Sequence, residues 1–470
     1  MKFLAIDLGA ESGRAILGTL EGGQLTLEEL HRFPNTPVRL PTGLYWDTLR
    51  LFHEIRHALF ICGRERKLDL DGIGIDTWGV DFALLGADGA LVDNPRHYRD
   101  ARTNGMLEET FASVPREEIF RETGIQFMPI NTLYQLHAMR LNGSPALDSA
   151  ARLLFMPDLF NYWLTGEMRA EVSIASTSQL YNPVAKQWAG TLFRRLNLPD
   201  RILPEVVPSG TRLGALLPEI AEASGLSANT PVYATACHDT AAAVAAVPAQ
   251  GADWCYISSG TWSLMGVELD APLIDDRSLA ANFTNEAGAG NTIRLLKNIA
   301  GLWLLQECRR AWALEGRAYS YEELSKLAAA APPSRTLIDP DAFVQPDRMP
   351  ERIAEYCRAH GHASPDQPAG MTRLILDSLA ASYRQALDHL ETLLDRRINR
   401  VHIVGGGSRN ELLNQLAANA TGRTVIAGPA EATAAGNILV QAIGANAVSG
   451  IAEARDIVRS SFPLRTYQPE

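Results

Sequence analysis

The chain opens with KFLAID (residues 2–7), continues through the turn LGAESGR (residues 8–14) and returns along AILGTL (residues 15–20). An apolar run that ends in a carboxylate and meets a glycine turn is typical of a strand entering a hairpin. A second glycine turn, EGG, follows at residues 21–23. The order strand, glycine turn, strand, glycine turn predicts a β-hairpin meander at the start of the chain.

A similar arrangement recurs just past the middle of the 470-residue chain, where residues 253–269 read DWCYISSGTWSLMGVEL. This stretch again places a small polar turn between two apolar strands. A long internal duplication implies two similar domains. Chance similarity is the alternative interpretation, because hairpins with glycine turns are common.

The rest of the chain alternates strand and helix patterns, which predicts an α/β fold. Apolar strands are expected at residues 70–77, 231–235, 400–404 and 424–427, and helices at residues 371–394 and 410–420. Residues 340–368 are rich in proline, and we expect a mobile or irregular insertion there.

Composition excludes several classes of protein. With 46% hydrophobic and 21% charged residues the chain matches ordinary globular proteins, and its length suits two or three domains. A net charge of −11 argues against nucleic acid as a partner. The weakly polar stretch 230–252 contains His238, Asp239 and Pro248, so no membrane span is expected. Asp7 stands where a signal peptide needs its apolar core, which predicts a cytoplasmic location.

The cysteine spacing does not suggest a redox pair or a zinc site, and the lysine positions exclude a P-loop. The five cysteines are scattered without a CxxC spacing, so we expect reduced, mostly buried thiols. None of the lysines lies in a Gly-x-x-x-x-Gly-Lys-Ser/Thr loop, which removes the P-loop nucleotide-binding proteins.

The two hairpin turns are candidate phosphate sites. After Asp7, the turn at Gly9 offers backbone N–H groups that no side chain shields, and Asp7 could hold a metal-bound water, since Mg²⁺ favours carboxylate and phosphate oxygens. The turn 259–261 matches it in the second half. An ordinary hairpin turn remains the alternative for each one alone, and the symmetric pair favours a nucleotide.

The segment 236–247, ACHDTAAAVAAV, predicts a helix that starts near Asp239 after a strand. An ionised carboxylate at that position can take the proton of a sugar hydroxyl as the oxygen attacks a γ-phosphate. The alternative is that Asp239 merely caps the helix. His238 is either a core histidine or a donor to the substrate.

Two further segments combine glycine with polar groups after a strand. GGGSRN at residues 405–410 could let a flat ring or a phosphate lie against the backbone, or could be a plain tight turn. DTWGVDF at residues 76–82 suits a sugar ring stacked on Trp78, with Trp78 as a simple core residue the alternative.

At these residues the sequence resembles the FGGY carbohydrate kinases, which share the fold of actin, hexokinase and the heat-shock ATPases, and within them it resembles the rhamnulokinases. The resemblance runs nearly end to end. It rests on ordered matches at residues 7–14, 74–81, 156–162, 237–240, 258–263, 297–303 and 404–407.

The resemblance implies two ribonuclease H-like domains, residues 1–247 and residues 248–470, with the active-site cleft between them. The first would hold the sugar and the catalytic base, and the second the nucleotide. The reaction would transfer the γ-phosphate of ATP, with Mg²⁺, to the 1-hydroxyl of L-rhamnulose in L-rhamnose breakdown. We expect a monomer whose partners are the sugar and ATP.

Site residues follow from the resemblance by position. Asp239 would be the base. The sugar would contact Gly79, His238, Asp239, Thr240 and Asn298, and ATP would contact Ala10, Glu11, Ser12, Gly13, Arg14, Thr261, Gln306, Gly405, Gly406 and Gly407. Glu11 departs from the pattern, because many relatives have a small serine there. Since a carboxylate repels phosphate, we expect Glu11 to point away or to reach Arg14.

Two other functions stay open from the sequence. One is a kinase for a related ketose such as L-fuculose, because side-chain positions set the stereochemistry of recognition. The other is a catalytically idle sugar-binding relative, against which the presence of Asp7, Asp239 and Thr261 together argues.

Overall fold

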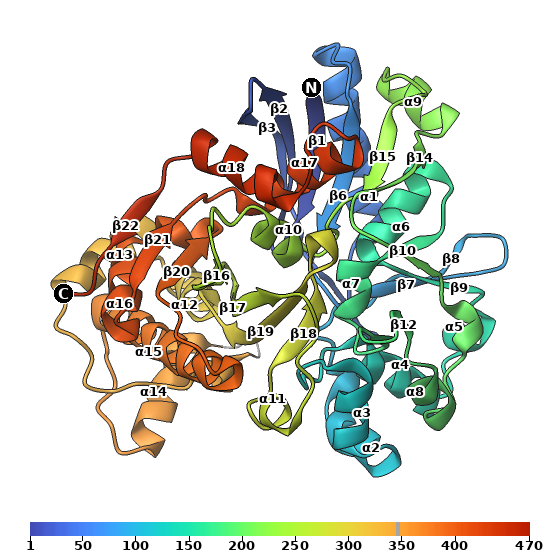
Figure 1. Cartoon of the computed structure of the whole chain (residues 1–470). Helices are drawn as coiled ribbons and strands as arrows, with labels where there is room; N and C mark the ends of the chain where they lie inside the picture. The colour runs from blue at the N-terminus through green and yellow to red at the C-terminus, as the bar shows by residue number, and fades with distance from the viewer. Residues whose placement is uncertain (345–347) are drawn as a thin grey trace. The chain divides into compact units, whose positions relative to one another are not determined.

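A computed structural model describes residues 1–344 and 348–470 of the chain (Figure 1). The described residues form two compact units. Unit 1 contains residues 1–246, 268–295 and 433–461, and unit 2 contains residues 247–267, 296–432 and 462–470. Each unit is described below by itself.

Unit 1 is built on a six-stranded sheet with the order β14-β15-β6-β1-β2-β3. Strands β1, β2 and β3 pair antiparallel, which confirms the predicted meander, whereas β6 pairs parallel with both β1 and β15. The strands are β1 (Lys2–Leu8), β2 (Ser12–Glu21), β3 (Gln24–Pro34), β6 (Gly72–Thr77), β14 (Thr211–Ala215) and β15 (Pro231–Ala234).

A second sheet has seven strands in the order β18-β19-β17-β16-β20-β21-β22. Strands β16 and β17 form the second predicted hairpin, and β20 pairs parallel with both β16 and β21. The strands are β16 (Trp254–Ser259), β17 (Trp262–Leu269), β18 (Thr284–Ala287), β19 (Ile293–Ala300), β20 (Arg400–Val404), β21 (Thr424–Ala427) and β22 (Arg465–Tyr467). The series β19-β17-β16-β20-β21 therefore repeats the series β3-β2-β1-β6-β15, which supports the internal duplication.

Shorter strands form smaller, separate sheets. A three-stranded sheet has the order β8-β7-β9, and three pairs are β4-β5, β10-β13 and β11-β12. These strands are β4 (Val38–Leu40), β5 (Gly43–Tyr45), β7 (Phe82–Leu85), β8 (Leu91–Asp93), β9 (Arg152–Phe155), β10 (Arg169–Glu171), β11 (Tyr181–Asn182), β12 (Gln187–Trp188) and β13 (Glu205–Val207).

Helices pack on these sheets and confirm the α/β class. Those of unit 1 are α1 (Thr48–Phe60), α2 (Met106–Ser113), α3 (Arg116–Thr123), α4 (Thr132–Leu141), α5 (Pro145–Ser149), α6 (Met156–Thr165), α7 (Val172–Ser176), α8 (Gly190–Arg195), α9 (Pro218–Ser224), α10 (Asp239–Ala245), α11 (Asp276–Ala280), α17 (Ala432–Gly444, from its second residue) and α18 (Ile451–Ser461). Unit 2 contains α12 (Trp303–Leu314), α13 (Tyr321–Ala330), α14 (Met349–Ala359), α15 (Pro368–Leu394) and α16 (Glu411–Thr421). The predicted helices 371–394 and 410–420 are confirmed as α15 and α16.

Helix α17 comes from the far end of the sequence and lies against the N-terminal sheet, where it is drawn in red beside β1 in Figure 1. Gln441 on α17 donates a hydrogen bond of 3.1 Å to the carbonyl oxygen of Leu4 on β1. A Cβ atom on Gly18 would lie 2.5 Å from the Cδ1 atom of Ile438, so this glycine permits the close approach of helix and sheet.

The proline-rich segment 340–368 differs from its prediction. It contains a 3-10 helix at Pro340–Phe343 and helix α14, so an irregular insertion is the wrong interpretation for most of it. Residues 345–347 of the segment lie outside the described residues. The five cysteines are buried and free, as expected. Within residues 1–344 and 348–470, no helix has the length and apolar character needed to cross a membrane.

Candidate active site

Three carboxylates gather in unit 1 where strands of the central sheet end. Asp7 on β1 and Asp76 on β6 are direct partners in the parallel register. Beyond β6, Thr77 pairs with His238 in an isolated parallel bridge, and the amide of Thr77 donates to the carbonyl oxygen of Cys237. The bridge brings the start of helix α10, and with it Asp239, to the edge that carries Asp7 and Asp76.

Asp76 is fully buried and is held by the C-terminal helix. Asn437 on α17 donates 2.5 Å to Asp76 Oδ2, whereas Asp76 Oδ1 is buried without a hydrogen-bond partner in the described part of the chain. Burial raises the pKa of Asp76 well above its usual value, and the negative charge of Asp7 raises it further. The raised pKa favours the protonated, neutral form of Asp76 beside Asp7.

Asp239 is the first residue of α10 and His238 is the N-cap residue, so Asp239 does not occupy the N-cap position. The Asp239 side chain is half-buried, with 31% of it exposed. Its Oδ1 atom accepts hydrogen bonds from the amide of Thr240 at 2.5 Å and from the hydroxyl of Thr240 at 3.1 Å. Burial raises the pKa of the Asp239 carboxyl, although the neighbouring His238 lowers it.

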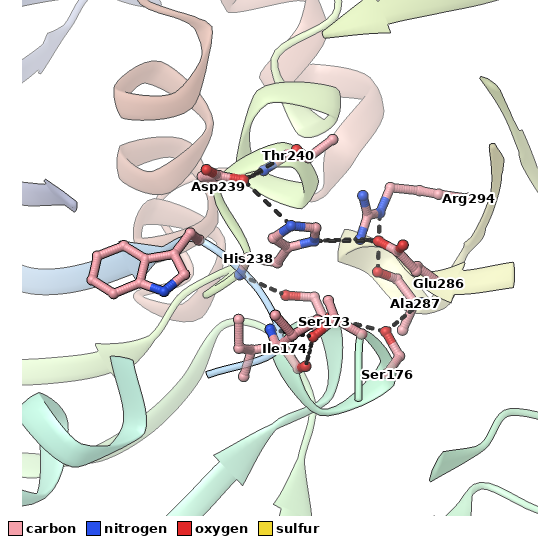
Figure 2. Close-up of polar contacts among 12 residues, drawn as sticks. Ser173, Ile174, Ser176, His238, Asp239, Thr240, Glu286, Ala287 and Arg294 are labelled. Carbon is pink, nitrogen blue, oxygen red and sulfur yellow. Dashed lines mark hydrogen bonds and ion pairs between the residues drawn. The ribbon is translucent and has the colours of Figure 1, made fainter. Parts of the chain in front are cut away.

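His238 is buried between Asp239 and a buried ion pair (Figure 2). Its Nε2 atom lies 3.4 Å from Asp239 Oδ1. Its Nδ1 atom lies 3.1 Å from Arg294 Nη2 and 3.3 Å from Glu286 Oε2. Arg294 in turn donates 3.0 Å to Glu286 Oε2 and 3.1 Å to the carbonyl oxygen of Ala287.

The backbone of His238 is also fixed. Its amide donates 3.1 Å to Ser173 Oγ on helix α7, and the amide of Ala287 donates 2.9 Å to Ser176 Oγ on the same helix (Figure 2). Helix α7 thus joins the strand that carries Glu286 to the turn that carries His238.

The segment after β6 adopts a strained conformation. Val80 has φ of 67°, which is unusual for a β-branched residue. Its amide donates 3.0 Å to Thr177 Oγ1, and its carbonyl oxygen accepts 2.6 Å from Thr132 Oγ1. A Cβ atom on the preceding Gly79 would lie 3.2 Å from the Thr177 side chain. Buried hydroxyl groups therefore hold the backbone around Gly79 in one position.

Trp78 belongs to the core, which decides between the two interpretations of this residue. Its ring centroid lies 4.0 Å from that of Trp46, and it is 5% exposed. Both indole nitrogens donate to Asp81 Oδ2, at 3.0 Å from Trp78 and 2.6 Å from Trp46. Gln135 donates 3.0 Å to Asp81 Oδ1. Burial raises the pKa of Asp81 to about 6 despite these hydrogen bonds.

The first hairpin turn of unit 1 is braced by a side chain that sequence reasoning missed. Gly9 donates 3.0 Å to the carbonyl oxygen of Ser12, and Asn35 Nδ2 donates 2.8 Å to the carbonyl oxygen of Gly9. Arg14 forms an ion pair with Asp7 across the hairpin. Glu11 is exposed at the tip of the turn.

Unit 2 contains the turn 259–261 with Thr261 and helix α12 with Gln306, which are two of the predicted nucleotide residues. The amide of Trp303 donates 3.1 Å to the carbonyl oxygen of Thr261, which places the start of α12 beside this turn. Gln306 on α12 has a buried Oε1 atom without a hydrogen-bond partner in the described residues.

The glycine turn 405–407 after β20 packs against Ser259 in the turn 259–261. A Cβ atom on Gly407 would lie 2.0 Å from Ser259 Oγ, and one on Gly405 would lie 3.0 Å from the carbonyl oxygen of Ser259. Gly405 has φ of 82°, whereas Gly406 has open space around it. Asn298 lies on β19 and is half-buried. The contacts with sugar and nucleotide stay predictions.

Comparison with known proteins decides the family. The sequence model of the N-terminal domain of the FGGY family of carbohydrate kinases matches residues 2–246, and that of the C-terminal domain matches residues 255–445. The chain belongs to the FGGY family of carbohydrate kinases. As an FGGY member it is a sugar kinase, with a sugar and ATP as its small-molecule partners.

Full-length relatives agree with this FGGY assignment. A rhamnulokinase of Bacteroides thetaiotaomicron is 46% identical over 470 residues, covering 100% of this chain and 96% of the relative. Rhamnulokinases of Oceanobacillus iheyensis and Pectobacterium carotovorum are 40% and 43% identical over 99% of this chain, covering 97% and 92% of their own lengths. The resemblance stated from the motifs is therefore confirmed.

Solved structures support the FGGY fold at low sequence identity. Xylulose kinase from Lactobacillus acidophilus has a TM-score of 0.82 at 15% identity, covering 100% of this chain and 94% of that one. Glycerol kinase from Plasmodium falciparum, solved with ADP, has a TM-score of 0.79 at 14% identity with the same coverage. Together with the strand order, these matches confirm the two-domain α/β fold.

Proposed function

We propose that this sugar kinase transfers the γ-phosphate of ATP to the 1-hydroxyl of L-rhamnulose, giving L-rhamnulose 1-phosphate and ADP in L-rhamnose breakdown. The observation that supports this substrate is the similarity, along nearly the whole chain, to relatives named rhamnulokinase. The solved structures match at identities too low to bear on the choice of sugar.

Asp239 is the proposed base. Its half-buried carboxylate lies at the start of α10, and burial raises the pKa of this carboxyl, which makes the carboxylate a better proton acceptor. As the 1-hydroxyl oxygen bonds to the γ-phosphorus, its proton passes to Asp239 and the bond from phosphorus to the bridging oxygen of ADP breaks. Gly79, His238, Thr240 and Asn298 are the proposed sugar contacts.

The proposed nucleotide contacts are the hairpin turn 10–14, Thr261, Gln306 and the glycine turn 405–407. The proposed metal is Mg²⁺, and Asp7 fits the ion's chemistry, because Mg²⁺ takes one or two carboxylates together with phosphate oxygens and waters. No group of three or more His, Cys, Asp or Glu side chains in the described residues could hold a metal by itself, so Asp7 would act through water and phosphate. Bound Mg²⁺ would neutralise phosphate charge.

ADP release tests the substrate. The purified protein is given Mg-ATP with L-rhamnulose, L-fuculose, L-ribulose, D-xylulose, D-fructose or no sugar. The proposal expects the largest kcat/KM with L-rhamnulose and slow ATP hydrolysis without sugar. Preference for another ketose would refute the substrate and keep the kinase, whereas no stimulation by any sugar would favour an idle sugar-binding relative.

The variant Asp239→Asn tests the base. We expect ATP binding near that of the wild type and a loss of turnover of about 10²- to 10⁴-fold, the usual range for general-base catalysis. Asp276→Asn is the matched control, because Asp276 is also the first residue of a short helix in unit 1 and its side chain is exposed. Near-normal turnover by Asp239→Asn would refute the assignment.

A further inference from the structure

The two oxygens of Asp239 have different surroundings. Each polar contact of this carboxylate within the described residues meets Oδ1, from the amide and hydroxyl of Thr240 and from His238 Nε2. Oδ2 has no such contact, although 31% of the side chain is exposed. The oxygen that remains for a ligand is therefore Oδ2.

The orientation of His238 depends on which of its nitrogens carries a hydrogen. An arginine guanidinium can only donate, so the 3.1 Å contact from Arg294 Nη2 requires a lone pair on His238 Nδ1. In the neutral ring the hydrogen then sits on Nε2, which faces Asp239 Oδ1. The donor from Arg294 and the carboxylate of Asp239 facing Nε2 thus both favour the Nε2–H tautomer, whereas Glu286 Oε2 near Nδ1 favours the other.

Glu286 serves the other protonation state of the ring. If Nδ1 carries a hydrogen, that N–H group can donate a hydrogen bond to Glu286 Oε2 at 3.3 Å, while Nε2–H still faces Asp239. Arg294 is fully buried and Glu286 nearly so, and their 3.0 Å ion pair keeps both groups in place. Burial acts to raise the pKa of Glu286, but the charges of Arg294 and His238 and the hydrogen bonds with them lower it overall, which favours the ionised carboxylate.

We propose that Arg294 and Glu286 are positioning residues that keep the Nε2–H group of His238 directed at Asp239 Oδ1, which leaves Asp239 Oδ2 as the atom that receives the sugar proton. This inference rests on the proposed role of Asp239 as the base. It assigns two residues a role that acts through the orientation of His238.

The other charged groups near this cluster do not replace the pair. Asp7 and Asp76 act on Asp239 through their charge, and Arg14 pairs with Asp7. Glu171 accepts a hydrogen bond of 3.1 Å from the amide of Cys237, next to His238 in the chain. Among the described residues, the polar side chains within hydrogen-bond or ion-pair distance of the His238 ring nitrogens are those of Asp239, Glu286 and Arg294.

The first test reads the tautomer directly and needs no turnover. Two-dimensional ¹H–¹⁵N spectra of histidine-labelled protein separate protonated from unprotonated ring nitrogens, and His238→Gln assigns the signal. At neutral pH we expect Nε2 to carry the hydrogen in the wild type. In Arg294→Gln the charged donor to Nδ1 is gone and Glu286 remains as acceptor, so the hydrogen should move to Nδ1. A wild-type ring with its hydrogen on Nδ1 would overturn the proposal.

The second test is kinetic. Arg294→Gln should lower kcat at least 10-fold with the KM for ATP changed less than threefold, and Arg294→Lys, which keeps a charged donor, should recover part of the loss. Glu286→Gln keeps Arg294 and should lose less than Arg294→Gln. Equal kcat in Arg294→Gln and the wild type would refute the proposal.

A control variant separates positioning from the loss of a partly buried ion pair in general. Arg423 in unit 2 pairs with Glu391 at 2.8 Å and has a side chain 12% exposed. Arg423→Gln should leave the His238 tautomer and kcat unchanged. If Asp239→Asn turns over normally while the tautomer shifts as expected, the base assignment fails and the orientation of His238 stands, so the two failures are distinguishable.

Discussion

Asp81 offers a quantitative test of the structure beside the proposed sugar contact Gly79. Its carboxyl group is 1% exposed and accepts hydrogen bonds from the indoles of Trp46 and Trp78, from the amide of Tyr98 and from Gln135. Burial raises its pKa from 3.8 to about 6. The folded state therefore binds this proton more tightly than the unfolded state does.

The sign of the pH effect follows from that difference. Stability contributed by protonation of Asp81 is fully present below the unfolded pKa of 3.8 and is lost as the pH rises through about 6. At about 1.4 kcal/mol per pKa unit, the whole shift amounts to about 3 kcal/mol. Between about pH 5 and pH 7.5 the stability lost corresponds to about one pKa unit of the shift. The wild-type protein therefore loses about 1.4 kcal/mol of unfolding free energy through Asp81 over this range.

The perturbation is Asp81→Asn, which cannot ionise. Three donors meet Oδ2, so the asparagine oxygen stays there and its amide faces Gln135 Nε2, donor against donor, at a cost of about 1–3 kcal/mol. Loss of the buried charge offsets this at pH 7.5. We expect the variant to be near or above wild-type stability at pH 7.5 and to fall relative to it by about 1.4 kcal/mol at pH 5.

The assay is urea unfolding of both proteins at pH 5.0 and pH 7.5, compared as a double difference so that other titrating groups cancel. The control is Asp253→Asn in unit 2, because its exposed ion pair with Arg400 lowers the Asp253 pKa from 3.8 and leaves it ionised at both pH values. Its double difference should be zero within error. If the difference in unfolding free energy between Asp81→Asn and the wild type is the same at both pH values, the reasoning is refuted.

Two glycines give further predictions from the space around them. Gly79→Ala would place a Cβ atom 3.2 Å from Thr177, so we expect a several-fold rise in the KM for sugar with the KM for ATP unchanged, measured by ADP release; an unchanged sugar KM would contradict this. Gly407→Ala would place a Cβ atom 2.0 Å from Ser259 Oγ, whereas Gly406→Ala meets open space. Thermal unfolding should show a lower Tm for the first of these two variants alone, and equal values would argue against the packing of this turn.

The hairpins and the strand ends could be predicted because their signals are local. A run such as KFLAID fixes both the strand and the residue that closes it, and the parallel pairing of β1 with β6 then places Asp7 opposite Asp76. The same applies to Asp239, whose strand and helix start are adjacent in sequence. For these residues, the residues within a few positions in the sequence determine the strand end or helix start on which they lie.

The groups that complete the site carry no local signal. Asn437 reaches Asp76 from 361 residues away, and α17 reads in sequence as an ordinary apolar helix. Proline-rich composition misled the interpretation of residues 340–368, since proline at the start of a helix is favourable, and both the 3-10 helix there and α14 have proline in their first turn.

Arg294 and Glu286 show why residue type alone misses positioning groups. Each would be taken for a surface residue, since arginine and glutamate are almost never fully buried unless they are paired. They become partners because β18 and β19 are neighbours in the sheet, and they become partners of His238 because helix α7 fixes both the His238 amide and the amide after Glu286. A buried ion pair adds little net stability over apolar packing. The role proposed for this pair, to hold a hydrogen on Nε2 of His238, therefore does not depend on a gain in the free energy of folding.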